Sequence, residues 1–113
     1  MAKKIIENSV GRQAFINNDK KTAVRWTLQI LEDKAPGSTV EVRVPPYGAI
    51  QCISDGSNHR RGTPPNVVEM SPEVWLGVAT GKMDYNIEVS NGNIMTSGAH
   101  AGEVERLLPL VVL

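Results

Sequence analysis

Cys52 and His59 are the two side chains whose types could supply a nucleophile and its general base. A thiolate becomes an effective nucleophile when a neighbouring imidazole accepts its proton. These two residues are separated by an expected strand-to-loop boundary, and the sequence places neither an orienting carboxylate nor an oxyanion hole beside them. A lone cysteine in a strand is more often a small buried hydrophobic residue. We therefore expect a protein that is not an enzyme.

A Gly-Lys pair in the stretch "EVWLGVATGKM", residues 73–83, raises the alternative of a phosphate-binding loop. Such a loop needs G-x-x-x-x-G-K-[ST] between a strand and a helix. Here Gly77 and Gly81 are one residue too close, and Met83 occupies the place of the metal-binding hydroxyl. With Ser71 as a helix cap, the stretch is instead typical of an amphipathic helix that ends at a glycine.

Arg60 and Arg61, which follow His59, could bind the phosphate or carboxylate head group of a ligand. Arginine binds such oxygens in a two-pronged way. The alternative is a solvated loop, so this pair is a prediction of possible head-group contacts only. Two histidines and one cysteine match no known spacing of metal ligands, and we expect neither a metal nor a cofactor.

The composition is that of one ordinary globular domain. The chain has 113 residues, with 12 basic and 12 acidic side chains, so its net charge gives no global attraction to nucleic acid or to an anionic membrane. A single cysteine excludes an intrachain disulfide and fits a reducing cytoplasm. We see neither a secretory signal nor an apolar stretch long enough for a membrane span. We expect a cytoplasmic protein with no nucleic-acid partner and no integral-membrane segment.

The elements that would position any site follow an α+β order. Residues 1–18 read as a loosely held N-terminal arm with a short helix around Ser9–Phe15, and residues 19–113 as a single domain. Apolar residues at helical spacing predict a helix from residue 20 that Pro36 and Gly37 stop. Alternation and turn signals predict strands over 38–44, 47–54, 66–70 and 93–98, and further helices over 71–83, 85–91 and 101–113.

The segment from about residue 67 to the end resembles the sterol carrier protein type 2 family. The resemblance rests on Trp75, Leu76, the small Gly77 and Val78, followed by the run Thr80–Met83, and on the spacing of the later elements. The upstream part, residues 22–70, is similar to the compact bacterial branch of this family. Together the resemblance covers about residues 22–110.

This resemblance implies a mixed or antiparallel sheet of about five strands, with helices packed on one face around an apolar cavity. It also implies the binding of a fatty acyl chain, lipid or sterol without catalysis. Trp26 and Trp75 are most simply core aromatic residues. The sharper hypothesis is that one apolar cavity is lined by Val42, Val44, Ile50, Val67, Trp75, Leu76, Leu107 and Leu108.

Two functions remain open from the sequence. The first is a lipid-binding carrier module. The second is a protein-interaction or accessory domain with a filled core, working beside a thiol-dependent enzyme. The apolar tail "LLPLVVL" could plug a cavity, cover it, or bind a second copy and form a homodimer. The free volume beneath the last helix would distinguish the two functions.

Overall fold

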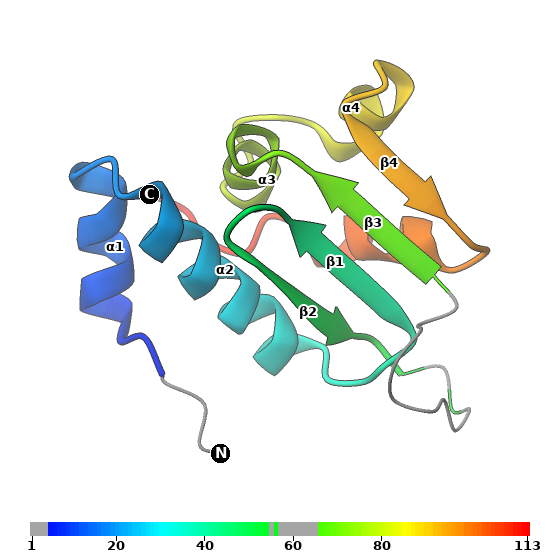
Figure 1. The fold of residues 1–113 in the computed structure, drawn as a ribbon, viewed down its shortest axis with the longest axis horizontal. Coiled ribbons are helices and arrows are strands. Elements are labelled where there is room, and N and C mark those ends of the chain that lie inside the picture. Colours follow the sequence, from blue (N-terminus) through cyan, green and yellow to red (C-terminus); the bar gives the residue numbers. More distant parts are fainter. Residues whose placement is uncertain (1–4, 55, 57–65) are drawn as a thin grey trace.

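The computed structural model describes residues 5–54, 56 and 66–113, and it has the predicted α+β architecture (Figure 1). Helices and strands follow one another in the order expected from the sequence. They are α1 (Asn8–Ile16), α2 (Lys20–Lys34), β1 (Val40–Val44), β2 (Gly48–Cys52), β3 (Asn66–Met70), α3 (Pro72–Ala79), α4 (Tyr85–Ser90), β4 (Ile94–Ser97) and the 3-10 helix η1 (Ala101–Leu107).

The strands form one mixed sheet in the order β2-β1-β3-β4. Strand β1 is antiparallel to β2 and parallel to β3, and β4 is antiparallel to β3. The described residues thus contain four strands, and the expectation of about five is not confirmed. Each segment with an alternating pattern became one strand. The fifth strand was implied by the family resemblance alone, with no alternating segment of its own.

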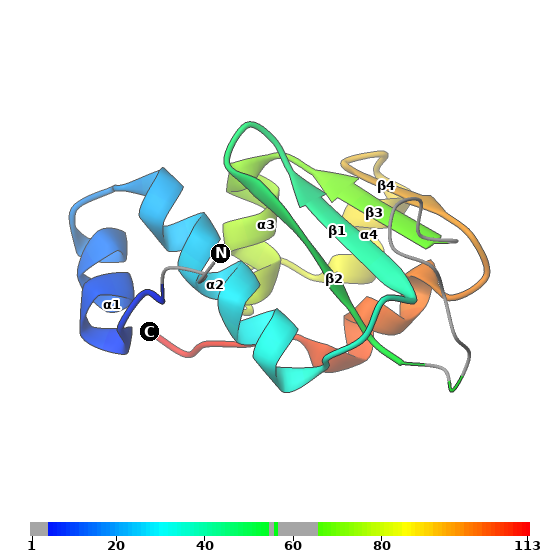
Figure 2. The same ribbon diagram turned by 60° about the horizontal axis from the view of Figure 1, so that its bottom comes forward.

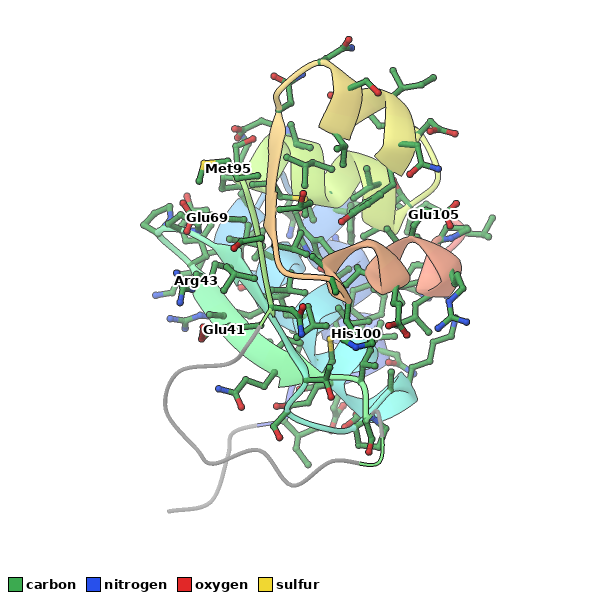
Figure 3. The ribbon with its side chains drawn as sticks, turned by 90° about the vertical axis from the view of Figure 1, so that its right-hand side faces the viewer. Glu41, Arg43, Glu69, Met95, His100 and Glu105 are labelled. Carbon is green, nitrogen blue, oxygen red and sulfur yellow. The ribbon has the colours of Figure 1, made fainter. Side chains whose placement is uncertain are left out.

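The sheet has one covered face and one open face. The register places Val42 beside Ile50 and Val68, and these side chains point toward α2, α3 and η1. The other face carries Glu41, Arg43, Glu69 and Met95, which project away from the helices (Figure 3). Figure 2 shows the same layering from another side. The predicted packing of helices on one face is therefore confirmed.

Side-chain caps fix where the helices begin. The Asp19 carboxylate accepts from the Thr22 N–H at the start of α2, the Ser71 hydroxyl accepts from the Val74 N–H at the start of α3, and Asp84 caps α4. Gly81 follows α3 with a φ of +77°, a conformation that side chains with a Cβ rarely adopt. The helix interpretation of residues 73–83 is therefore confirmed, and the phosphate-loop interpretation is excluded.

The C-terminal element differs from the expected helix over 101–113. A 3-10 helix, η1, ends at Leu107, because Pro109 cannot donate a helical hydrogen bond. The backbone N–H groups of Leu110 and Val111 instead donate to the Ala79 carbonyl at the end of α3. The tail thus runs beside α3 and buries Val111.

The N-terminal arm contains α1, as predicted, and α1 is held against α2 rather than loosely. The Trp26 ring fills the contact. It lies so close to Gly11 that a Cβ there would come within 2.0 Å of the ring. The Trp26 indole N–H donates to Asn8 Oδ1 at 3.1 Å, and Phe15 packs edge-on at 6.1 Å between ring centroids. Trp26 is therefore the anchor of α1.

Candidate functional site

The thiol chemistry considered from the sequence has no support in the fold. Cys52 is fully buried, and burial raises the pKa of its thiol to about 12, so the thiolate is scarce at neutral pH. His59, Arg60 and Arg61 lie outside the described residues, so the head-group prediction for the two arginines remains a prediction. Within the described ranges, no cluster of three or more histidine, cysteine, aspartate or glutamate side chains could hold a metal ion.

Three of the predicted cavity residues belong to a filled core. Val42, Val44 and Trp75 expose none of their surface, so no hollow large enough for a water molecule touches them. The Trp75 indole N–H donates to the Thr27 hydroxyl at 2.8 Å, which fixes the ring between α3 and α2. The hydroxyl in turn donates to a carbonyl one turn earlier in α2. A cavity at this place is not confirmed.

The other predicted residues are divided among several places. Val67 lies on the open face of the sheet, because it is paired with Glu41 and with Ser97, so it cannot share a lining with Val42. Leu76 and Leu107 are partly buried against the core. Leu108 lines a largely polar cleft of about 390 Å³ with Lys82 and Glu105. The expectation of one common cavity is therefore not confirmed.

Ile50 lines an apolar cleft on the helix-covered side of the sheet, and Val67 lines a separate hollow on the open face. This cleft, which we call the α2–β2 cleft, lies between helix α2 and the edge strand β2 and has a volume of about 280 Å³. Its walls are mainly apolar. The lining residues are Ile6, Arg25, Leu28, Gln29, Tyr47, Gly48, Ala49 and Ile50.

The absence of a side chain at Gly48 opens the α2–β2 cleft. Gly48 sits opposite Val44 in the hairpin, on the helix-covered face of the sheet. A Cβ added at Gly48 would meet Leu28 Cδ1 at 3.4 Å, an ordinary contact distance. The position thus has room for a methyl group, and a longer side chain would occupy the cleft.

Arg25 is the charged residue in the lining of the α2–β2 cleft. Its Nε donates to the Tyr47 carbonyl at 3.1 Å, which holds the guanidinium beside the cleft. None of the lining residues that the structure describes is a carboxylate, so none of them neutralises the cation. A guanidinium held in this way can offer its remaining N–H groups to a carboxylate or phosphate.

Gln29 connects the cleft to the N-terminal segment. Its amide oxygen accepts from the Ile6 N–H at 2.9 Å, and its amide nitrogen donates to the Ile6 carbonyl at 2.9 Å. The Ile6 side chain completes the lining of the cleft. Residues just ahead of α1 are therefore fastened at the cleft, and α1 is fastened in turn by Trp26.

Sequence reasoning missed most of this site. The available signal was the spacing of Arg25, Leu28 and Gln29, which places them on neighbouring turns of one helix. The sequence predicts that Tyr47 and Gly48 belong to a strand, but it does not predict which helix packs beside that strand. Which helix lies beside which strand depends on tertiary packing, and the local pattern does not contain that information.

A protein-family model matches most of the chain. The family model described as "Bacterial SCP ortholog" matches residues 17–110. No curated protein matches the sequence. In the described part of the chain, no helix is both long and apolar enough to span a membrane. The match takes in α2 through η1 and leaves out α1 and the segment before it. Because it covers well over half of the chain, the chain belongs to the family of bacterial SCP orthologs, which are sterol-carrier-like proteins.

Proposed function

We propose that the protein is a non-catalytic carrier-type module that holds one apolar chain in the α2–β2 cleft. Membership of a sterol-carrier-like family supports a carrier over an enzyme. The observation that carries the proposal is the apolar cleft that Gly48 leaves open beside Leu28. The filled core around Trp75 favours this cleft over a site beneath the sheet.

The size of the cleft sets the class of ligand. A volume of about 280 Å³ is near the lower end of the range for small-molecule sites, about 300–1,000 Å³. It suits a medium-length acyl chain better than a rigid sterol. Each buried methylene contributes about 0.8 kcal/mol. Ten methylenes contribute roughly 8 kcal/mol, which corresponds to micromolar affinity before the costs of association are subtracted, so we expect a chain of roughly ten carbons to bind more weakly than that.

Arg25 would give this site a preference for an anionic head group. We expect wild-type protein to bind decanoate about tenfold more tightly than decanol, a difference of ~1.4 kcal/mol. Arg25→Gln should remove that preference and leave decanol binding unchanged. Isothermal titration calorimetry with both ligands measures it. Lys21→Gln is the matched control, because it removes the same charge from an exposed position on α2 outside the cleft. Equal preference in wild type and Arg25→Gln would contradict this role for Arg25.

The segment at Ile6 would limit exchange of the ligand. Gly11→Ala forces a Cβ into the Trp26 ring, so α1 should detach and release Ile6 from the cleft. We expect several-fold faster ligand association and dissociation by stopped-flow fluorescence, with a smaller change in Kd, and a red shift of Trp26 emission. Gly102→Ala is the control, because an added Cβ there meets no atom within 4 Å. A shifted Trp26 emission with unchanged exchange rates would show that the segment does not restrict exchange.

The alternative function is a protein-interaction domain with a filled core. The full burial of Val42, Val44 and Trp75 favours it, since the core itself offers no room for a ligand. Native mass spectrometry of protein purified from cells, before and after organic extraction, separates the two functions. A carrier should show an added mass close to that of a medium-length fatty acid, and extraction should remove it. A protein that carries no ligand and does not bind added decanoate would favour the interaction domain.

A further inference from the structure

Strand β4 is the open edge of the sheet. It stands last in the order of the described strands, and among them it pairs with β3 alone. Figure 3 looks onto this edge, and in the described part of the chain no helix or strand crosses in front of it. The sequence from Asn93 to Gly98 contains no charged residue and no proline. Edge strands usually carry such residues, because unpaired backbone groups invite another strand.

The opposite edge, β2, is better protected. Helix α2 packs along β2, and the Arg25 guanidinium caps the Tyr47 carbonyl at the start of the strand. Past its end, the Ile53 N–H donates to the Ala35 carbonyl at 2.7 Å. Added pairing is therefore favoured at β4 over β2.

A projecting side chain and a receiving hollow lie together at the β4 edge. Met95 is 68% exposed on the open face of the sheet. Beside it lies a hollow of about 280 Å³, lined by Arg43, Val67, Glu69, Met95, Thr96 and Ser97. Ser97 and Val67 are register partners, so Ser97 lies between the edge of the sheet and Val67. Because the serine side chain is small, it leaves Val67 accessible from the edge. The surface thus carries both halves of a self-complementary contact, as a twofold-symmetric interface requires.

We propose that this edge binds a second copy of the chain, with two β4 strands pairing antiparallel across a twofold axis. The alternation of faces limits the register, since Met95 and Ser97 face the open side and Ile94 and Thr96 face the helices. Thr96 lies opposite Thr96 of the second copy, and Met95 lies opposite Ser97. Each Met95 then crosses the small serine and packs on Val67 of the other copy.

The chemistry of this pairing is consistent on both faces. Two threonines meet on the axis, a cross-strand pair that stabilises sheets. No charged side chain of β4 meets another, because the strand has none. A strand of four residues buries little area, so the interface falls in the weak class below about 1,200 Å². The dimer is therefore reversible, and it does not depend on the proposed ligand.

Cysteine crosslinking tests the arrangement in the full-length chain. Residues directly opposite on antiparallel strands have Cα atoms about 4.5–5.5 Å apart, within disulfide range. Thr96→Cys should give a disulfide-linked dimer under mild oxidation. Ile87→Cys, exposed on α4, is the control that should remain monomeric. The native Cys52 is buried and should not react. Crosslinking of Thr96→Cys no greater than that of the control would overturn the proposal.

Sedimentation equilibrium provides the independent measurement on unmodified protein. Wild type should show a concentration-dependent mass rising from 12.3 kDa toward twice that value. Met95→Lys should remain monomeric. Each lysine would replace the apolar contact of Met95 with Val67 of the other copy, and the interface would then hold two ammonium groups on the same face of the sheet. Met95 is exposed, so this variant should keep the wild-type circular dichroism spectrum. A wild-type chain that stays monomeric at the highest concentration, or a Met95→Lys variant that dimerises as wild type does, would exclude the interface.

Discussion

Replacing Gly48 with leucine is expected to abolish binding of an acyl chain while the protein stays folded. A Cβ at this position already touches Leu28 Cδ1 at 3.4 Å, and the rest of a leucine side chain would lie in the α2–β2 cleft. A cleft of about 280 Å³ does not have room for both a leucine side chain and a ligand chain. We expect the affinity for decanoate to fall at least tenfold, or ~1.4 kcal/mol.

Gly48→Ala is the control for the leucine variant, because the two substitutions differ only in the size of the added side chain. Gly48→Ala adds one methyl group at an ordinary contact distance and should reduce affinity much less than leucine. Calorimetric titrations of wild type, Gly48→Ala and Gly48→Leu give the order of their decanoate affinities. Urea unfolding curves show that all three proteins are folded. Added apolar surface against Leu28 should keep the leucine variant near wild-type stability. A leucine variant that is folded and binds decanoate as tightly as wild type would place the ligand elsewhere.

Replacing Trp75 with alanine is expected to cause the largest loss of stability. The ring is fully buried and lies in the main core with Val42 and Val44. Removing a large aromatic residue from a core costs about 3–5 kcal/mol. A domain of this size has a total stability of about 5–15 kcal/mol. Urea denaturation should therefore show a large fall in the midpoint.

Trp75→Phe separates the structural role of Trp75 from a ligand-binding role. It keeps most of the buried ring and removes the N–H that donates to Thr27. The expected loss is about 1 kcal/mol plus a small packing term. Decanoate affinity should not change, because Trp75 does not line the α2–β2 cleft. A phenylalanine variant with near-native stability and lost ligand binding would instead support the cavity predicted from the sequence.

The local pattern predicted the elements well because their signals are local. The alternation in Val40–Val44 marks a strand with one buried side, and Ser71 with Pro72 marks the start of α3. The last element was predicted less well. The apolar residues Leu107 and Leu108 favour one long helix, whereas the helix ends before Pro109. Beyond it, the Leu110 and Val111 N–H groups donate to the Ala79 carbonyl.

The site was harder to predict, because a core residue and a ligand-binding residue have the same apolar composition. Trp75 and Val42 looked suitable for a cavity, yet the fold packs them fully. Conversely, Gly48 carries no side-chain signal at all, and its importance arises only because α2 brings Leu28 beside it. Arg25 likewise has no distinguishing pattern in the sequence, and its place in the cleft depends on the hydrogen bond that its Nε donates to the Tyr47 carbonyl.

Net charge also concealed a local difference. The basic and acidic residues balance over the chain, but no described residue of the cleft lining is an acidic partner for Arg25. The total charge therefore predicts that the whole protein is not attracted to nucleic acid or an anionic membrane, but it gives no information on the local charge at the α2–β2 cleft.

The most direct test of the proposed site is an NMR titration of ¹⁵N- and methyl-labelled protein with a spin-labelled acyl chain. The account predicts saturable broadening centred on the Gly48 amide and the Leu28 and Ile50 methyl groups, which all line the α2–β2 cleft. Signals of the Trp75 indole and the Val42 methyl groups should broaden less. Broadening centred on Trp75, or none that saturates, would contradict the account.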